Sequence, residues 1–422
     1  MTTASLRVLF ISAVPTDPPD AGNRVRIMTL TRSVIAAGHE VHFAYFPMES
    51  CDLRAMQARF GPDRLHVLHS RLEPPRGGLL SRAARKLGRL MNIEQAFVWG
   101  LDDWYDERAN SELAALHSLH EYDAVFVEYV FASKALEAFP PDCLRVLDTH
   151  DCFGLRHRLY LKAGMRPQWF STSVADEDSG FRRADIVLAI QASESRDFKA
   201  RVEGSKTRVL QVGHLIDIAD AAPPSRREAA VFLGSANPIN VAGARHFIDR
   251  VLPIVRRTKP GFQLLLAGAV STEFEDQDGV VKLGFVPNLQ DAFGAAMIAV
   301  NPVLVGTGVN IKLLDAMASA MPIVTTRSGA RGVEELDGHA LFVVEDEDPG
   351  AFANRILGLI DDADARRRLS AAARSAAEKW NAAQVSTLVG ALVRKSTRCA
   401  ARDAAKPSQS RIAIDPFNLG GT

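Results

Sequence analysis

The segment from Ile298 to Thr326 holds the residue types and spacing best suited to chemistry. A glycine loop precedes a helical stretch in which Lys312 and Asp315, three residues apart, share one face. Amides at a helix start, together with the helix dipole, favour a phosphate. A lysine neutralises phosphate charge, and a carboxylate accepts hydrogen bonds from ribose hydroxyls. The segment therefore predicts a nucleoside diphosphate site whose loop contacts are Gly306, Thr307, Gly308 and Val309.

The elements around this loop are predicted from apolar runs. Runs at 298–300 and 323–324 flank the loop and helix, which gives the order strand, loop, helix, strand. The same alternation recurs along the chain and restarts near residue 231, after a stretch whose Pro223-Pro224 marks a linker. A helix is expected over 241–257. Two series of strand–helix units predict two parallel sheets with helices on both faces.

The segment resembles the nucleotide-sugar-binding core of retaining glycosyltransferases of family four, also called group 1 glycosyltransferases. The matching residues are Gly306, Gly308, Lys312, Asp315, Ala316, Met317, Pro322, Val324 and Thr326. Members usually carry two glutamates here, seven residues apart. The second falls on Asp315, and the first falls on Thr307, which supplies no carboxylate.

The resemblance implies an α/β protein of GT-B fold, with two Rossmann-like doubly wound parallel-sheet domains that face a cleft. Residues 1–218 would form the acceptor-side domain, and 219–380 the nucleotide-sugar-binding domain. A helix at 381–395 would return to the first domain. Residues 396–422 lack periodicity and are expected to be a disordered tail.

The first strand and the loop after it do not match a dinucleotide site. The loop holds only Gly22, and the second strand ends in Phe46-Pro47, without the acid that binds an NAD ribose. The resemblance instead implies that Gly22 lets the backbone approach the donor phosphate or sugar. Arg24 and Arg26 follow in the first helical turn, facing either the acceptor side of the cleft or solvent.

A second candidate site follows the strand that ends at Asp148. His150 lies just past the carboxyl end of that strand, where ligands of parallel sheets bind. By the resemblance, His150 contacts the transferred sugar and is catalytic together with Lys312; the alternative is a histidine that only caps a turn. Glu128 ends the strand DAVFVE and either binds the acceptor or is a surface acid.

The second domain offers further donor contacts. Gly234 and Ser235 follow its first strand and would give backbone amides and a hydroxyl to the diphosphate or sugar. The turn with Phe285 and Val286 resembles the family's base-contacting turn.

Composition limits the classes of function. The chain has 422 residues, with 50 basic and 50 acidic side chains, so no net field attracts nucleic acid. The four cysteines are scattered, no metal-binding spacing is present, and no cofactor is expected besides the nucleotide-sugar substrate. No signal peptide or membrane-spanning run is seen, which favours a cytoplasmic protein.

Residues 76–92 form a basic amphipathic pattern. Apolar residues are expected along one helical face, Leu80, Ala83, Leu87, Leu90 and Met91, with Arg82, Arg85, Lys86 and Arg89 opposite. Such a helix either lies on an anionic membrane at the inner face or packs on the domain.

The expected reaction is transfer from a nucleoside-diphosphate sugar to a hydroxyl of a polysaccharide or lipid-linked glycan, with retention and without metal. A GT-B epimerase or phosphorylase, and a non-catalytic nucleotide-sugar-binding protein, are the alternatives.

Overall fold

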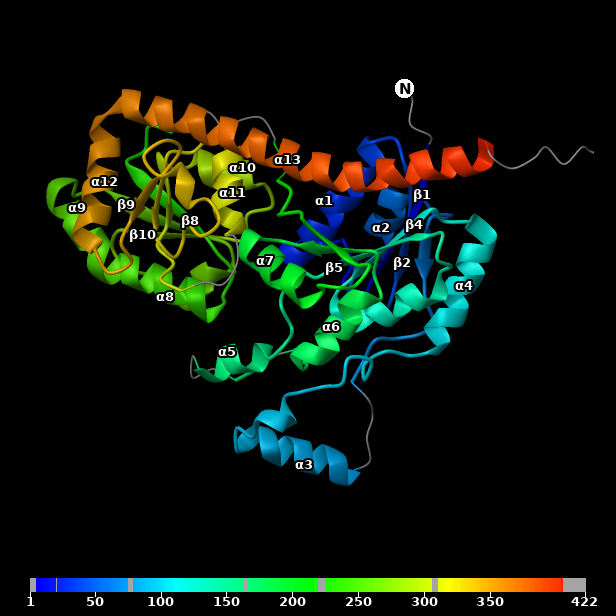
Figure 1. Cartoon of the computed structure of the whole chain (residues 1–422). Coiled ribbons are helices and arrows are strands. Elements are labelled where there is room, and N and C mark those ends of the chain that lie inside the picture. The colour runs from blue at the N-terminus through cyan, green and yellow to red at the C-terminus, as the bar shows by residue number, and fades with distance from the viewer. Residues whose placement is uncertain are drawn as a thin grey trace, which may run out of the picture.

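The computed structural model has two α/β lobes that are bridged by one long helix (Figure 1). It describes residues 5–19, 21–74, 79–162, 166–167, 169–216, 218, 225–305 and 310–404. The predicted fold class, two doubly wound parallel-sheet domains, is confirmed. The prolines predicted to mark the linker lie outside the described residues.

The first lobe is built on a seven-stranded parallel sheet in the order β3-β2-β1-β4-β5-β6-β7. Its central strands are buried along nearly their whole length because helices cover both faces. The order reverses between β1 and β4, and ligands of such sheets bind at the carboxyl ends beside that reversal. The strands are β1 (Arg7–Ser12), β2 (Glu40–Tyr45), β3 (Leu65–Val67), β4 (Ala124–Glu128), β5 (Leu144–Asp148), β6 (Ile186–Ala189) and β7 (Arg208–Gln211).

The helices of this lobe connect successive strands, and one of them, α3, projects from the body (Figure 1). Short 3-10 segments lie at Glu94–Ala96 and Val130–Ala138. The helices are α1 (Gly22–Ala36), α2 (Leu53–Phe60), α3 (Leu79–Leu90), α4 (Arg108–His120), α5 (Arg156–Lys162), α6 (Val174–Arg182) and α7 (Ala192–Arg201).

The second lobe has a six-stranded parallel sheet in the order β10-β9-β8-β11-β12-β13, which reverses between β8 and β11. The sheet therefore has the same kind of crevice as the first one. Its strands are β8 (Ala229–Leu233), β9 (Gln263–Ala267), β10 (Val280–Gly284), β11 (Ile298–Asn301), β12 (Ile323–Thr326) and β13 (Phe342–Val344).

The helix expected over 241–257 is interrupted in the structure. It consists of α8 (Pro238–His246), a π turn (Phe247–Val251) and α9 (Leu252–Thr258). Pro253 lies in the first turn of α9 and has no N–H to donate, so the chain widens just before it. The lobe also contains α10 (Leu289–Gly294), α11 (Ile311–Ala318), α12 (Pro349–Asp361) and 3-10 segments at Ala269–Glu273 and Glu334–Leu336.

The bridging helix is α13 (Ala363–Ala404), which runs along both lobes (Figure 1). Ala373 and Ala377 pack in the core of the second lobe, whereas Leu388 and Leu392 pack in the core of the first. The helix continues to Ala404, into the stretch 396–422 that was expected to be a disordered tail. Alanine and arginine favour helix there, and residues 405–422 lie outside the described residues. No helix among the described residues is long and apolar enough to cross a membrane.

Candidate functional site

A cavity of about 320 Å³ lies at the carboxyl edge of the first sheet, on the side that faces the second lobe. The loops after β4, β5, β6 and β7 and the start of α1 form most of its wall. The second lobe closes it with the first residue of α11. The lining residues are Gly22, Asn23, Arg26, Tyr129, His150, Asp151, Trp169, Ile190, Glu194, His214 and Ile311.

Gly22 brings the two lobes close together. It is the first residue of α1, and a Cβ at this position would lie 3.0 Å from Cδ1 of Ile311. That separation is tighter than an ordinary van der Waals contact, so a larger residue would push against α11. Both Gly22 and Ile311 line the cavity, so the starts of α1 and α11 meet at its wall.

Arg26 is held in the wall of the cavity by a buried ion pair. Its Nε and Nη2 donate to the two carboxylate oxygens of Asp148, each at 2.7 Å, and it also donates to the carbonyl oxygens of Val212 and Gly213. Burial alone would raise the pKa of Asp148, but the Arg26 guanidinium and His150 outweigh it and hold that pKa below its ordinary value. Asp148 is therefore ionised, and the guanidinium balances its charge.

His150 lies beside this ion pair and is bonded to a second acid. Its Nε2 is 2.5 Å from Oε2 of Glu128 and 3.5 Å from Oδ2 of Asp148. Burial, followed by the charge of Asp148, raises the pKa of Glu128 well above its ordinary value. Burial lowers the pKa of His150 to about 4. A protonated Glu128 donates to Nε2 of a neutral imidazole, which leaves its Nδ1–H for a ligand.

The backbone around this histidine is strained. His150 has φ 58° and Tyr129 has φ 73°, in a backbone region that residues other than glycine rarely adopt. Their rings stack with centroids 4.0 Å apart, and both line the cavity. Strain of this kind persists where the surrounding structure fixes a functional geometry.

His214 is a further buried imidazole in the cavity wall. Burial lowers its pKa to about 3, with the charge of Arg26 adding to the effect. Among the residues that the structure describes, neither ring nitrogen of His214 has a hydrogen-bond partner. A buried polar group is normally bonded, so these nitrogens are suited to a polar ligand in the cavity.

Lys312 lies in the second lobe, and its amine does not line the cavity. Its Nζ donates to Oδ1 of Asn240 and lies 4.8 Å from the ring centroid of Phe232. Asn240 in turn donates to the carbonyl and hydroxyl oxygens of Ser235. Burial lowers the pKa of Lys312 to about 7. The structure thus brings together Lys312 and the loop after β8, both predicted to contact the donor diphosphate.

The other residues predicted to bind the donor have different outcomes in the structure. Gly306, Thr307, Gly308 and Val309 lie outside the described residues. Asp315 is one turn beyond Lys312 on α11, and Phe285 is 74% exposed after β10, with Val286 partly buried beside it. The prediction for the Gly234 amide is corrected. Its N–H donates to the carbonyl of Ala267 at 2.9 Å and is not available to a phosphate.

Two acceptor-side predictions are also corrected. Arg24 is 8% exposed and pairs with Glu49 at 2.9 Å, away from the cavity lining. Glu128 is fully buried, so it reaches a ligand only through His150. The local sequence does not reveal either outcome, because both depend on loops that are distant in the chain.

Sequence reasoning missed several cavity residues, namely Asn23, Tyr129, Trp169, Ile190, Glu194, His214 and Ile311. Most of them follow the carboxyl ends of strands, the same rule that identified His150. Applying it to β4, β6 and β7 would have found Tyr129, Glu194 and His214. Trp169 lies in a loop between helices and gave no such signal.

Part of the chain, within the second lobe, matches a known protein family. Residues 227–362 match the family model described as "Glycosyl transferases group 1". This lobe matches the group 1 glycosyltransferases. A Klebsiella pneumoniae protein described as "Uncharacterized 44.6 kDa protein in cps region" is 30% identical over 122 residues. That alignment covers 26% of this chain and 31% of the Klebsiella protein.

More than nine-tenths of the chain resembles solved structures in fold. TarM aligns with a TM-score of 0.63 at 10% identity, over 92% of this chain and 99% of that one. Sucrose-phosphate synthase from Thermosynechococcus elongatus aligns with a TM-score of 0.62 at 16% identity, over 93% and 100%. Anabaena HepE in complex with UDP and glucose gives 0.56 at 15% identity, over 95% and 100%. The fold of this chain is GT-B.

Proposed function

We propose that this protein transfers a sugar from a nucleoside-diphosphate sugar to a hydroxyl acceptor, with retention of configuration and without a metal ion. The observation that carries the proposal is the cavity between the lobes, with His150 on one wall and the start of α11 on the other. The group 1 match over residues 227–362 supports sugar transfer. The UDP complexes of Staphylococcus aureus TarM and Anabaena HepE support UDP as the nucleotide.

The donor would span the second lobe and reach into the cavity. Its diphosphate would lie near the start of α11, where the helix dipole and Lys312 provide positive charge. Asp315 would accept hydrogen bonds from the ribose, and the turn at Phe285 and Val286 would contact the base. The sugar would then face His150 and His214 in the cavity.

In the proposed reaction, the acceptor oxygen attacks the anomeric carbon from the side that the diphosphate leaves. The bond to the diphosphate oxygen breaks, and the acceptor proton passes to that oxygen. Lys312 stabilises the departing charge, while the Nδ1–H of His150 donates to the sugar. Closure of the lobes excludes water, which would otherwise hydrolyse the donor.

The buried acids behind His150 do not require a metal. Glu128, Asp148 and His150 place one ligand atom each within 4.8 Å of one another, as a metal site would. Arg26, however, already supplies the cation, through two hydrogen bonds to Asp148. Burial keeps Glu128 protonated, and a protonated carboxyl is a poor metal ligand. This arrangement supports metal-independent transfer.

The test is incubation of the full chain with a panel of labelled nucleotide sugars, with UDP sugars first. We expect release of UDP from one donor, and faster release when the acceptor glycan is added. Lys312→Ala should lower turnover by about 10²–10³. Lys259→Ala is the control, because that lysine pairs with Asp361 at the surface of the same lobe.

Each alternative gives its own result in this assay. An epimerase would change the donor sugar without releasing the diphosphate, and a phosphorylase would need inorganic phosphate. Binding without turnover of any donor would leave the non-catalytic alternative. Anomeric proton NMR of the product reports retention, and turnover by the folded chain that needs a divalent ion would contradict the metal-free mechanism.

We propose that the acceptor is a polysaccharide or lipid-linked glycan, reached at an anionic membrane surface through α3. The name of the Klebsiella relative, a protein in a cps region, supports a polysaccharide. Within 76–92, residues 76–78 and the side chains of Leu80 and Arg82 lie outside what is described.

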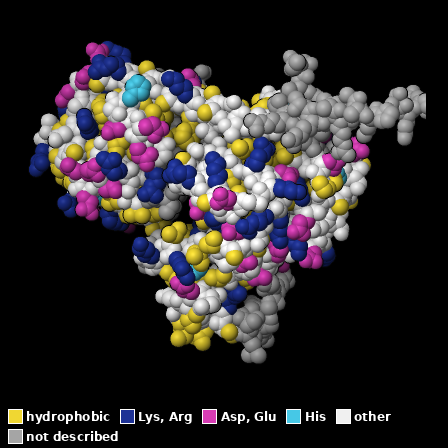
Figure 2. All heavy atoms as spheres, viewed as in Figure 1, with side chains coloured by type: hydrophobic (Ala, Val, Ile, Leu, Met, Phe, Trp, Pro, Cys, Tyr) yellow, Lys and Arg dark blue, Asp and Glu magenta, His cyan; other side chains and the backbone are white. Residues whose placement is uncertain are grey.

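The described part of α3 contacts the body through its basic side and not through its apolar side. Arg85 lies 3.7 Å over the ring of Trp99 and donates to the carbonyl of Val98, so this cation faces the body. Leu87, Leu90 and Met91 are 58%, 68% and 65% exposed. Figure 2 shows hydrophobic side chains at the tip where α3 projects. An exposed apolar face beside lysine and arginine suits an anionic bilayer.

Vesicle flotation tests this proposal. We expect the full chain to float with vesicles containing anionic lipid, and Leu87→Gln with Leu90→Gln to abolish flotation. Leu119→Gln is the matched control, because Leu119 is 73% exposed on α4. Equal flotation of all three proteins would refute a role for α3.

A further inference from the structure

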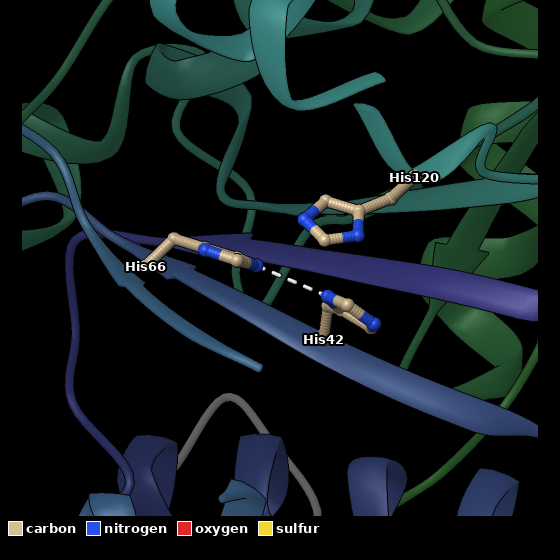
Figure 3. Close-up of side chains that lie close together, drawn as sticks. All are labelled: His42, His66 and His120. Atoms are coloured by element: carbon tan, nitrogen blue, oxygen red, sulfur yellow. Dashed lines mark hydrogen bonds between the residues drawn. The ribbon is translucent and has the colours of Figure 1, made fainter. Parts of the chain in front are cut away.

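Three histidines meet on the first sheet, apart from the cavity residues described above (Figure 3). They are His42 on β2, His66 on β3 and His120, the last residue of α4. Each offers a ring nitrogen, and these atoms all lie within 4.8 Å of one another. Figure 3 shows the three rings turned toward a common point.

The positions of β2, β3 and α4 bring these three histidines together. In the parallel register, His66 pairs with Ala44, and His42 is two residues before Ala44 on the same strand. Side chains two apart on a strand share a face, so both imidazoles point to the same side of the sheet. The third imidazole, that of His120, comes from the end of α4. The next residue, Glu121, has φ 50° and turns the chain toward β4.

The ligand atoms are already close to the spacing of a metal site. Nδ1 of His42 lies 3.0 Å from Nε2 of His66, and the hydroxyl of Tyr122 lies 3.1 Å and 3.4 Å from those two atoms. Tetrahedral zinc with nitrogen ligands at about 2.0–2.1 Å places neighbouring ligand atoms about 3.3 Å apart. An ion therefore fits with small side-chain movements.

A carboxylate outside the cluster also orients one of its rings. Oε1 of Glu40 lies 3.3 Å from Nε2 of His42, and a carboxylate in that position directs the lone pair of Nδ1 into the cluster.

We propose that His42, His66 and His120 bind one zinc ion, with a fourth position for water or for the hydroxyl of Tyr122. Three imidazole nitrogens are a donor set that zinc, copper and nickel favour over magnesium or calcium. His66 and His120 are only half-buried, so the ion has a route from solvent. The ion would tie the edge strand β3 and the end of α4 to β2. Its role is therefore structural and independent of sugar transfer.

The test is zinc binding by the full chain after removal of metal with a chelator. We expect one zinc per chain in competition with a chromophoric chelator, and a higher midpoint of thermal unfolding when zinc is added. His66→Gln and His120→Gln are at half-buried positions, and each should weaken zinc binding at least about tenfold. Glu40→Gln should weaken it by about 10–100-fold, as the loss of an outer partner does. Cobalt in place of zinc should give the visible absorption of a tetrahedral site.

The control is His69→Gln, whose imidazole is 98% exposed in the loop after β3. It should leave zinc stoichiometry and affinity unchanged. The proposal is overturned if the wild-type chain binds no zinc, or if the variant lacking both His66 and His120 binds it as tightly as the wild type. UDP binding, measured in parallel, should not respond to zinc.

Discussion

The pKa of Lys312 leads to a quantitative prediction about donor binding. In the free protein, burial against Phe232 and Asn240 lowers this pKa to about 7. A diphosphate placed beside the amine favours the charged form and should return the pKa toward its ordinary value. Proton uptake on binding of the diphosphate should therefore be about one half at pH 7 and approach one proton at pH 8 to 9.

The size of the effect follows from linkage. If the complex keeps Lys312 protonated up to pH 9, the affinity for UDP falls as the free amine loses its proton. For a free pKa of about 7, the loss between pH 6 and pH 9 is about 90-fold, or about 2.7 kcal/mol. Above pH 7 the direction is fixed, because a pKa that rises on binding makes the affinity decrease as the pH increases. His150 and His214 do not contribute, since their pKa values of about 4 and 3 lie below this range.

Calorimetric titration with UDP from pH 6 to pH 9 at constant ionic strength measures this dependence. Repeating it in buffers of different ionisation enthalpy counts the protons taken up. Lys312→Arg is the matched control, because arginine remains charged throughout and should bind UDP with little change above pH 7. An affinity that is constant from pH 7 to pH 9 in the wild type, or one that falls equally in the arginine variant, would refute the assignment of Lys312 to the diphosphate.

Three further predictions concern stability, each measured by urea unfolding. Arg26→Met should lower the free energy of unfolding by about 3–5 kcal/mol, because it leaves the Asp148 carboxylate buried without its partner; a change below about 1 kcal/mol would contradict a buried ion pair. Gly213→Ala should cost about 1–3 kcal/mol, since its Cβ would lie 2.5 Å from Cζ2 of Trp380 on α13, and an unchanged midpoint would show that α13 shifts freely. Glu128→Gln should change stability by less than about 1 kcal/mol, because the amide replaces a protonated carboxyl of the same shape; a loss of several kcal/mol would show that the native group is ionised.

Much of the fold could be predicted from local patterns. Apolar runs of four or five residues, separated by helical periodicity and by glycine or proline, are properties of neighbouring residues. They specify strands and helices before any tertiary contact forms. His150 was found in the same way, because the end of β5 is visible in the sequence and the ligand edge of a parallel sheet is fixed by topology. The π turn before Pro253 shows the limit, since the periodicity continues across it.

The candidate site depends on contacts between distant segments. Arg26 and Asp148 are separated by 122 positions in the chain, and nothing near either one reveals that they pair. Lys312 could be assigned to a phosphate-binding loop from its spacing. Its hydrogen-bond partner Asn240, however, is 72 positions away in sequence. Arg24 is an example of a wrong prediction. Its place in the first helical turn is compatible with a cleft, but in the folded chain it pairs with Glu49.

The sequence by itself determined the alternation of strands and helices, the two-domain GT-B organisation and the edge at which His150 stands. The tertiary structure alone decided which charges are buried together and that the Gly234 amide is already hydrogen-bonded. It also decided that the described apolar residues of α3 face outward and that three histidines converge. The physical reason is the range of the forces involved. Backbone conformation and burial patterns are set by near neighbours, whereas ion pairing, desolvation and ligand geometry exist only after remote segments have packed.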